Sequence, residues 1–332
     1  MSAFGGQSIK TRNLSKALSD KIGKDNILCV DTKGWQEHPV RLLCNIRKAT
    51  SQCESVIILP ADRGLKAIPK LTFLCNQDAK LFYSVIGGWL PKMTKTNKRL
   101  RKTLKKYDGI WVEALAMKKA MEEQGFSNIS VVPNFKNITP LKPNELVYQI
   151  TEPYKLCTFS RVLKEKGIED AVNAVKAVND RCGRTVFTLD IYGQVDEGYA
   201  DRFNDLTAEF PDYIRYMGKA PGDRSVDILK VYFILLFPSY FYGEGFPGTL
   251  IDALSAGIPV IASDWAYNTE IIRDGYTGLI TVPQNVEDLS KKLEYCYHHV
   301  ADINHMKNNC IAEAQKYSKD IVADQIMSLI NK

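Results

Sequence analysis

The chain has 332 residues, too many for one ordinary hydrophobic core, so its length suits two domains of about 150 residues each. Its composition, with 45% hydrophobic and 25% charged residues, is that of a soluble globular protein, and no run of 18 apolar residues provides a transmembrane helix. The net charge of +6 is unevenly distributed: residues 1–150 have 25 Lys and Arg against 12 Asp and Glu, a net +13, whereas residues 151–332 have 19 against 26, a net −7.

This asymmetry indicates that the first half meets acidic partners, such as nucleic acid, anionic lipid or a phosphorylated acceptor. The eight cysteines are scattered with no Cys-x-x-Cys pair, which favours free thiols in a reducing compartment over a metal site. The N-terminus has no apolar stretch of the signal-peptide kind. We therefore expect a cytoplasmic protein.

The first half alternates short apolar strands with helices. Gly5 and Gly6 precede an amphipathic helix that extends to about residue 21, and Met1 to Phe4 are too few for a strand before it. Strands are predicted over 26–31, 55–59, 81–86, 108–112 and 129–132, with helices over 38–49, 64–75 and 114–124. The pattern indicates a parallel sheet without the usual central first strand, so that either the start is truncated or the domain has an unusual edge. Segment 133–145, rich in Pro and Asn, is typical of a linker.

One insertion, residues 87–107, carries eight Lys and Arg and no acid. A solvated helix face is one interpretation of such a charge run. The other is a membrane-surface contact, with Trp89 and Leu90 at the interface and Lys95, Arg99 and Lys102 over anionic lipid. Nucleic acid is a weaker alternative, because no nucleic-acid motif and little aromatic interleaving accompany the cations.

The second half repeats the alternation of strands and helices. Strands are predicted over 156–159, 186–192, 213–217, 233–237 and 259–262, followed by a turn and strand over 274–283 and helices from residue 286, the last over 319–331. Arg161 and Lys166 flank the turn after the first of these strands, and Gly193 ends the second. A positive charge is mildly unfavourable at a helix start, so these two cations favour a functional role over a structural one.

The stretch Tyr242 to Asp264 reads as a Gly-rich turn, a short helix over 248–256 and a buried strand. A helix N-terminus at the end of a parallel strand favours an anion, above all phosphate. Glu244 lies at the edge of this predicted site. Asp252 lies about one turn into the helix, where its carboxylate can lean back toward the same place.

Glu244 begins the run Glu-Gly-Phe-Pro, and seven residues separate it from the acid Asp252. This spacing resembles the E-x7-E signature of retaining GT-B glycosyltransferases of family GT4, the glycosyl transferases group 1, with Asp252 replacing the second Glu. The resemblance implies an α/β fold of two Rossmann-like doubly wound domains that face a cleft. Residues 1–145 would form the basic acceptor-side domain and residues 146–315 the donor domain. Residues 316–332 would pack back on the first domain.

The resemblance also implies a role for each matching residue. Glu244 would accept hydrogen bonds from the donor sugar, and Arg161 and Lys166 would neutralise the departing diphosphate. Asp252 would bind the ribose hydroxyls, or it would be a first-turn acid favoured by the helix dipole. The remaining donor-binding residues would act mainly through their backbone or small size: Gly5, Gly6, Gly193, Gly245, Phe246, Pro247, Gly248, Thr249 and Leu250.

The expected reaction is sugar transfer with retention from a nucleotide sugar, UDP- or GDP-linked, to a glycan or polyprenyl-diphosphate acceptor in surface polysaccharide synthesis. There is no Asp-x-Asp, so no metal or other cofactor is expected, and no His stands where Tyr83 to Gly88 match the acceptor side. The protein would work in the cytoplasm or on the inner membrane face, without nucleic acid. A nucleotide-sugar epimerase of the same architecture and a non-catalytic binding subunit are the alternatives. The residues do not specify the nucleotide, sugar, acceptor or linkage.

Overall fold

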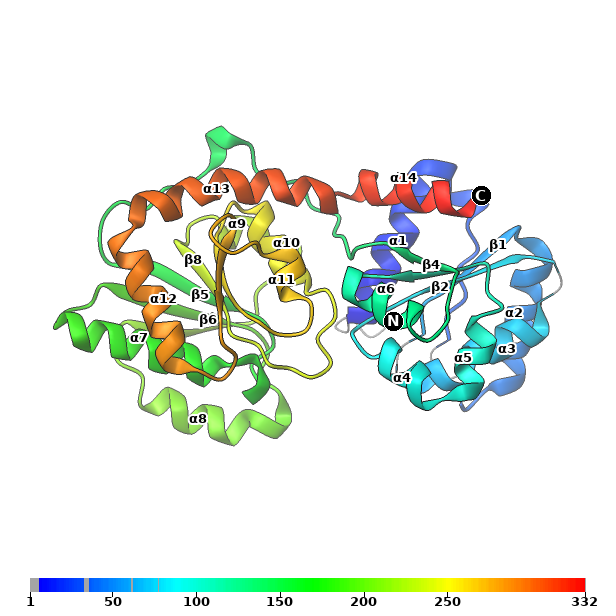
Figure 1. Cartoon of the computed structure of the whole chain (residues 1–332), viewed down its shortest axis with the longest axis horizontal. Helices are drawn as coiled ribbons and strands as arrows, with labels where there is room; N and C mark the ends of the chain where they lie inside the picture. The colour runs from blue at the N-terminus through cyan, green and yellow to red at the C-terminus, as the bar shows by residue number, and fades with distance from the viewer. Residues whose placement is uncertain (1–5, 33–35, 61, 77, 332) are drawn as a thin grey trace. The chain divides into compact units, whose positions relative to one another are not determined.

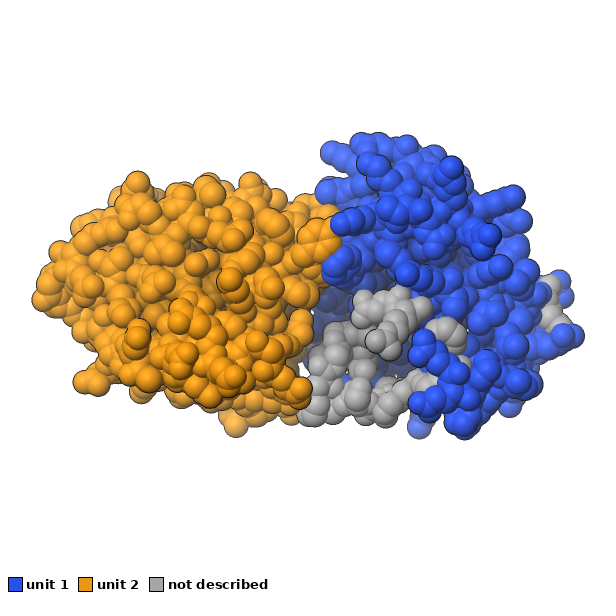
Figure 2. All heavy atoms as spheres, turned by 90° about the horizontal axis from the view of Figure 1, so that it is seen from below, with its two compact units in different colours: residues 1–137, 317–332 blue, residues 138–316 orange. Residues whose placement is uncertain are grey.

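The computed structural model describes residues 6–32, 36–60, 62–76 and 78–331, so Gly5 lies outside the described residues. The chain divides into two compact units, coloured separately in Figure 2. Unit 1 comprises residues 1–137 and 317–332, and unit 2 comprises residues 138–316. The division at residue 137 falls inside the Pro- and Asn-rich segment that the sequence indicated as a linker.

Unit 1 is built on a parallel sheet in the order β1-β2-β3-β4. Its strands are β1 (Ser55–Ile58), β2 (Lys80–Ser84), β3 (Gly109–Val112) and β4 (Ile129–Val131). Its helices are α1 (Gly6–Ile22), α2 (Pro39–Gln52), α3 (Ile68–Cys75), α4 (Leu90–Thr96), α5 (Lys98–Leu104), α6 (Leu115–Glu122) and α14 (Lys319–Ile330), with short 3-10 turns at Lys24–Asn26 and Asp62–Lys66. The alternation of strand and helix along the sequence thus produces the expected parallel α/β layers.

The last helix belongs to unit 1, where α14 packs beside α1 (Figure 1). Phe82 and Trp111 stack with ring centroids 5.1 Å apart and share one hydrophobic cluster with residues of both helices. Ion pairs of 2.6 Å between Lys319 and Asp20 and of 2.7 Å between Lys21 and Asp324 join the exposed sides of the two helices. The expectation that the C-terminal helix returns to the first domain is therefore confirmed.

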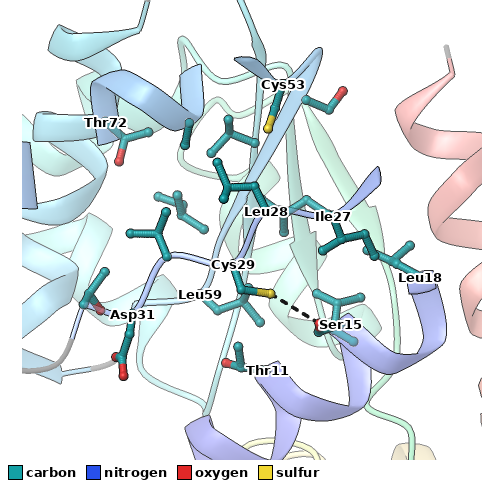
Figure 3. A pocket seen from close by; sticks show the side chains of 18 of the residues that line it. Thr11, Ser15, Leu18, Ile27, Leu28, Cys29, Asp31, Cys53, Leu59 and Thr72 are labelled. Atoms are coloured by element: carbon teal, nitrogen blue, oxygen red, sulfur yellow. Dashed lines mark hydrogen bonds between the residues drawn. The ribbon is translucent and has the colours of Figure 1, made fainter. Parts of the chain in front are cut away.

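The strand expected over 26–31 does not form. The chain makes a 3-10 turn at Lys24–Asn26 and then passes residues 27–32 without regular structure. A strand needs ladder hydrogen bonds with a neighbour, and β1, at the edge of the sheet, pairs only with β2 among the described strands. A cavity of about 1730 Å³ instead lies among α1, this segment and β1 (Figure 3). Within it, Ser15 and Cys29 lie 3.3 Å apart (Oγ to Sγ).

Unit 2 is built on a six-stranded parallel sheet in the order β10-β9-β8-β5-β6-β7. The strands are β5 (Tyr154–Phe159), β6 (Phe187–Tyr192), β7 (Ile214–Gly218), β8 (Ile234–Phe237), β9 (Val260–Ser263) and β10 (Gly278–Thr281). The helices are α7 (Ile168–Cys182), α8 (Ala200–Ala208), α9 (Ser225–Leu229), α10 (Gly248–Ser255), α11 (Asn268–Ile271), α12 (Val286–His298) and α13 (Val300–Ala314). Each of these strands overlaps a predicted one. Strands such as β8 and β9 are recognisable because a parallel strand covered on both faces is almost continuously hydrophobic.

The strand order of unit 2 changes direction at β5. This strand pairs with β6 on one side and with β8 on the other. After β5 the chain therefore first adds β6 and β7 on one side and later adds β8, β9 and β10 on the other. Ligands of doubly wound sheets bind outside the carboxyl ends of the strands at such a switch point. We therefore expect a functional site at the loops after β5 and β8.

Candidate functional site

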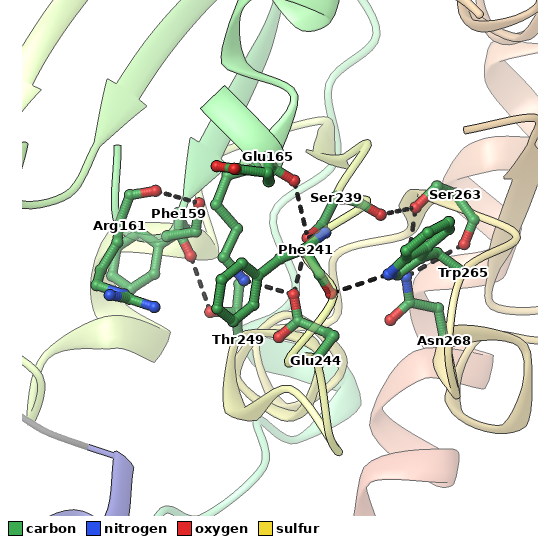
Figure 4. A network of polar contacts seen from close by, with 12 residues as sticks. Phe159, Arg161, Glu165, Ser239, Phe241, Glu244, Thr249, Ser263, Trp265 and Asn268 are labelled. Atoms are coloured by element: carbon green, nitrogen blue, oxygen red, sulfur yellow. Dashed lines mark hydrogen bonds and ion pairs between the residues drawn. The ribbon is translucent and has the colours of Figure 1, made fainter. Parts of the chain in front are cut away.

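The loops that follow β5 and β8 are joined by a buried ion pair (Figure 4). Lys166 Nζ lies 2.5 Å from Glu244 Oε2, and Ser239 Oγ donates a 2.7 Å hydrogen bond to the same carboxylate oxygen. The side chains of Lys166 and Glu244 are each 9% exposed. The two charged residues predicted from the sequence spacing are thus brought together, although 78 positions separate them.

A glycine lets these loops approach so closely. Gly167, directly after Lys166, has a φ of 69°, and a Cβ at this position would lie 2.3 Å from the carbonyl oxygen of Pro238. Only glycine adopts this conformation and leaves that space empty. The backbone of Tyr240 also donates a 2.8 Å hydrogen bond to the carbonyl of Glu165, so the two loops are held by main-chain contacts as well.

The ring of Phe241 lies near both predicted cations. Its centroid is 5.2 Å from Lys166 Nζ and 5.5 Å from Arg161 Cζ, within the range of cation–π attraction. Arg161 is 56% exposed, and its ion pair with Asp196 is 4.0 Å long. Its guanidinium group is therefore accessible to an anionic ligand at the end of β5.

The N-terminus of α10 faces the same loops. Thr249 Oγ1 donates a 2.8 Å hydrogen bond to the carbonyl of Phe159, the last residue of β5, which fixes the helix start against the strand end. The N–H group of Leu250 donates to the carbonyl of Pro247 at 3.1 Å, so Gly248 and Thr249 provide the first-turn N–H groups that an anion can use. The Leu250 side chain is fully buried in the core, so its own part in a site is limited to the backbone.

The other predicted residues lie in the Gly-rich turn before α10 and within α10 itself. Gly245, Phe246 and Pro247 are buried between the ion pair and the start of α10. Asp252 is 1% exposed, and its Oδ1 accepts a 3.0 Å hydrogen bond from Ser225 Oγ of α9. Its carboxylate thus contacts α9.

Gly193 allows a second close approach, at the end of β6. Its φ is 148°, and a Cβ would lie 1.7 Å from the carbonyl oxygen of Ser160. Tyr216 donates a 2.8 Å hydrogen bond from its hydroxyl to the Gly193 carbonyl, and its side chain is 39% exposed. The carboxyl ends of β5, β6 and β7 therefore meet around a glycine.

Ser239 and Phe241 are site residues that the sequence reasoning missed. The available signal for Ser239 was its position, since ligands of such sheets bind outside the carboxyl ends of the strands at a switch point. Trp265 Nε1 donates a 2.9 Å hydrogen bond to the Phe241 carbonyl, and the hydroxyl of Ser263 donates to the Ser239 carbonyl. These bonds hold the loop in place from β9 and the turn after it.

The predicted surface residues of unit 1 are divided between the exterior and the core. Lys95, Arg99 and Lys102 are exposed, and Trp89 is 37% exposed. Leu90 is only 1% exposed, so the expectation that it reaches a membrane interface is wrong. The insertion forms two short helices whose apolar residues are buried while the cations remain in solvent, as burial of apolar area favours.

The start of unit 1 contains a buried ion pair that the sequence did not indicate. Lys10 Nζ lies 2.5 Å from both Glu113 Oε1 and the carbonyl of Val85. Lys10 follows Gly6, the first residue of α1, by one helical turn, and Val85 and Glu113 directly follow β2 and β3. This pair fixes α1 to the carboxyl ends of two strands.

No group of three or more His, Cys, Asp or Glu in the described part of the chain is arranged to hold a metal ion. No described helix combines the length and hydrophobicity needed to cross a bilayer.

The chain is similar in sequence to known glycosyltransferases. The family model described as "Glycosyl transferases group 1" matches residues 147–317. The GtfA subunit of a UDP-N-acetylglucosamine–peptide N-acetylglucosaminyltransferase from Streptococcus gordonii is 33% identical over 189 residues, covering 55% of this chain and 36% of that protein. An N,N'-diacetylbacillosaminyl-diphospho-undecaprenol alpha-1,3-N-acetylgalactosaminyltransferase from Campylobacter jejuni is 29% identical over 113 residues, covering 33% and 30%.

The chain therefore spans only about a third of the length of these curated relatives. Among solved structures, Anabaena Alr3699/HepE in complex with UDP-glucose superimposes with a TM-score of 0.76 at 15% identity, covering 100% of this chain and 97% of that one. This likeness confirms the expected fold of two Rossmann-like units.

Proposed function

The chain belongs to the glycosyl transferases group 1 family, and on this premise we propose that it is a glycosyltransferase that moves a sugar from a nucleotide-sugar donor to a glycan or lipid-linked acceptor. The observation that carries the proposal is the Lys166–Glu244 pair at the switch point of unit 2, beside Arg161 and the N-terminus of α10. Cations, helix N–H groups and a carboxylate acceptor in one place match the parts of a nucleotide sugar: its diphosphate and its hydroxyl-rich sugar.

Each group has a role in this proposal. Glu244 uses Oε2 for Lys166 and Ser239, and its Oε1 accepts hydrogen bonds from the donor sugar. Lys166 and Arg161 hold the diphosphate and offset the charge that develops on it as it departs. The N–H groups of Gly248 and Thr249 bind a phosphate oxygen. Asp252 supports the nucleotide side of the site from within α10.

We assign the chain to the GT4 branch, with the E-x7-D form of its signature, and propose transfer with retention. The bond between the anomeric carbon and the phosphate oxygen breaks, and the acceptor oxygen bonds to the same face of that carbon. The acceptor proton passes to the departing diphosphate. The two cations perform the charge neutralisation that a divalent metal provides elsewhere, so no metal is required.

The names of the relatives support a class of donor and a class of acceptor. The S. gordonii relative is named for UDP-N-acetylglucosamine and the solved neighbour contains UDP-glucose, which supports a UDP-sugar as donor. The C. jejuni relative is named for a diphospho-undecaprenol acceptor, which supports a lipid-linked acceptor in glycoconjugate or polysaccharide synthesis. The exposed cations of α4 and α5 and the partly exposed Trp89 suit contact with an anionic membrane surface.

Thermal denaturation of the purified chain with UDP-, GDP-, ADP- and CMP-sugars tests donor binding, because a ligand that binds the folded state raises the melting temperature. We expect UDP-sugars to raise it most. Release of UDP from the stabilising donor, with and without lipid-linked diphosphate acceptors, then tests transfer. If no nucleotide sugar raises the melting temperature or is consumed, the proposed function is wrong.

A further inference from the structure

Unit 1 contains a small cationic depression that the donor site does not use. It has a volume of about 510 Å³ and is lined by Lys66, Met93, Thr96, Asn97, Lys98 and Arg99. Half of these residues carry a positive charge. These six residues form the cationic pocket.

The cationic pocket is formed by separate segments of the chain. Lys66 ends the 3-10 turn that follows β1, whereas the other five residues belong to the insertion that follows β2. The insertion bends at Asn97, whose Oδ1 accepts a 3.0 Å hydrogen bond from the N–H group of Leu100 and so begins α5. Both segments leave the carboxyl ends of parallel strands, the edge at which sheets of this type bind ligands.

The charge of the pocket is not balanced within the described chain. Lys66, Lys98 and Arg99 form no ion pair with any described acidic side chain, and no acid lines the pocket. Like charges gathered at one place repel one another, and an anion removes that cost. Other cations of the insertion find apolar partners instead: Lys106 Nζ lies 5.0 Å from the ring centroid of Phe73.

The donors of the pocket suit a diphosphate. Arg99 can bind two phosphate oxygens at once through its planar guanidinium, and each lysine adds a mobile point charge. The Asn97 side-chain N–H groups are available as further donors, because only its oxygen caps the helix. A diphosphate diester carries about two negative charges, which three cations can neutralise.

We propose that the cationic pocket binds the diphosphate group of a lipid-linked acceptor. This inference rests on the proposed function for the identity of the ligand. It assigns a site in unit 1 to the diphosphate of the acceptor, whereas the donor site holds the diphosphate of the nucleotide sugar. The pocket lies among the exposed cations of α4 and α5, so a lipid surface that attracts those helices would also bring the diphosphate to Lys66, Lys98 and Arg99.

The test uses the full chain with saturating UDP, so that the donor site is occupied, and measures binding of inorganic diphosphate by calorimetry. Lys66→Ala and Arg99→Ala should each weaken binding at least tenfold. Lys95→Ala and Lys102→Ala remove the same charge from neighbouring exposed positions outside the pocket and should weaken it less than twofold. Equal weakening by all four substitutions, or no binding by the wild-type chain, would overturn the proposal.

A second arm identifies the source of the diphosphate. Vesicles of phosphatidylcholine containing a few per cent of a polyprenyl diphosphate should retain the wild-type chain and lose the Lys66→Ala and Arg99→Ala variants, while vesicles of phosphatidylcholine and phosphatidylglycerol should bind all of them. Loss of the two pocket variants from both kinds of vesicle would refute a diphosphate site. UDP-sugar hydrolysis by the same variants should be unchanged, so failure of the pocket is distinguishable from failure of the proposed function.

Discussion

Lys166 Nζ lies 2.5 Å from Glu244 Oε2, with each side chain 9% exposed, so a buried ion pair joins the loop after β5 to the loop after β8. Burying two charges is costly unless they are paired and hydrogen-bonded, and here Ser239 supplies the additional hydrogen bond. The same pair presents a carboxylate and a cation at the switch point of a parallel sheet. Stability and proposed chemistry therefore depend on the same atoms, and substitutions can separate them.

Lys166→Met should destabilise unit 2, and Arg161→Ala should not. Loss of Lys166 leaves the buried Glu244 carboxylate unpaired, a change that typically costs about 3–5 kcal/mol. Arg161 is 56% exposed, so its removal should leave denaturant unfolding nearly unchanged while it lowers kcat/KM for the donor about tenfold or more. Urea unfolding and donor kinetics of both variants check this contrast. A markedly lower urea midpoint for Arg161→Ala than for the wild type would contradict the prediction.

Gly193→Ala should be poorly tolerated. The added Cβ would lie 1.7 Å from the Ser160 carbonyl oxygen at a φ of 148°, so the loop after β5 must move. We expect a loss of about 3 kcal/mol or more, in the range of severe strain. Gly222→Ala is the matched control, because no atom lies within 4 Å of the added carbon there. Thermal unfolding measures the melting temperature of both variants. Equal melting temperatures for Gly193→Ala, Gly222→Ala and the wild type would contradict this prediction.

The Lys10–Glu113 pair should contribute to the stability of unit 1 and should not affect donor binding. Glu113→Gln or Lys10→Met alone leaves a buried charge without its partner, whereas the double variant Lys10→Met/Glu113→Leu replaces both with apolar groups. The double variant should therefore be more stable than either single variant. A double-mutant cycle by denaturation measures the coupling, and the thermal shift produced by UDP should remain the same for every folded variant.

Lys307 should make stability depend on pH above neutrality. Burial lowers the pKa of Lys307 to about 8, and its ammonium donates a 3.1 Å hydrogen bond to the Tyr232 carbonyl. Between this value and the ordinary lysine pKa of about 10.4, the unfolded chain binds the proton that the folded chain has lost, so the destabilising cost of burying the Lys307 charge decreases as pH rises. Below about pH 8 both states are charged and the burial cost is constant.

Lys307→Met isolates this effect. At pH 7 the variant should be at least as stable as the wild type, because it removes a buried charge. Its advantage should shrink between pH 8 and about pH 10. Buried thiols such as Cys310, whose pKa burial raises, act in the opposite direction in both proteins. A difference in unfolding free energy that did not change with pH would contradict this account.

Much of the fold could be predicted from the sequence, because buried parallel strands leave continuous apolar runs. Residues 26–31 show the limit: Ile27, Leu28 and Val30 favour a strand, but a strand also needs ladder hydrogen bonds with a neighbour, which the local sequence does not report. Leu90 shows another limit, since the many cations around it concealed an apolar residue that faces the core.

The candidate site was predictable in its residues and not in its contacts. Spacing identified Glu244, Arg161 and Lys166, but no local pattern reports that Lys166 pairs with Glu244 or that Ser225 donates to Asp252. These contacts join segments that are distant in the chain, and only the sheet order brings them together. Ser239 could have been found from its place after β8, whereas Ser225 had no sequence signal.

The most direct test of the proposed function is sugar transfer by the Glu244→Gln variant. Glutamine keeps the size of the side chain and removes the negative charge that pairs with Lys166. The matched control is Glu209→Gln, at an exposed position of unit 2. Turnover of the UDP-sugar that stabilises the wild type should fall at least a hundredfold in Glu244→Gln and stay within twofold in Glu209→Gln, with both variants folded. Full turnover by Glu244→Gln would contradict the site proposed here.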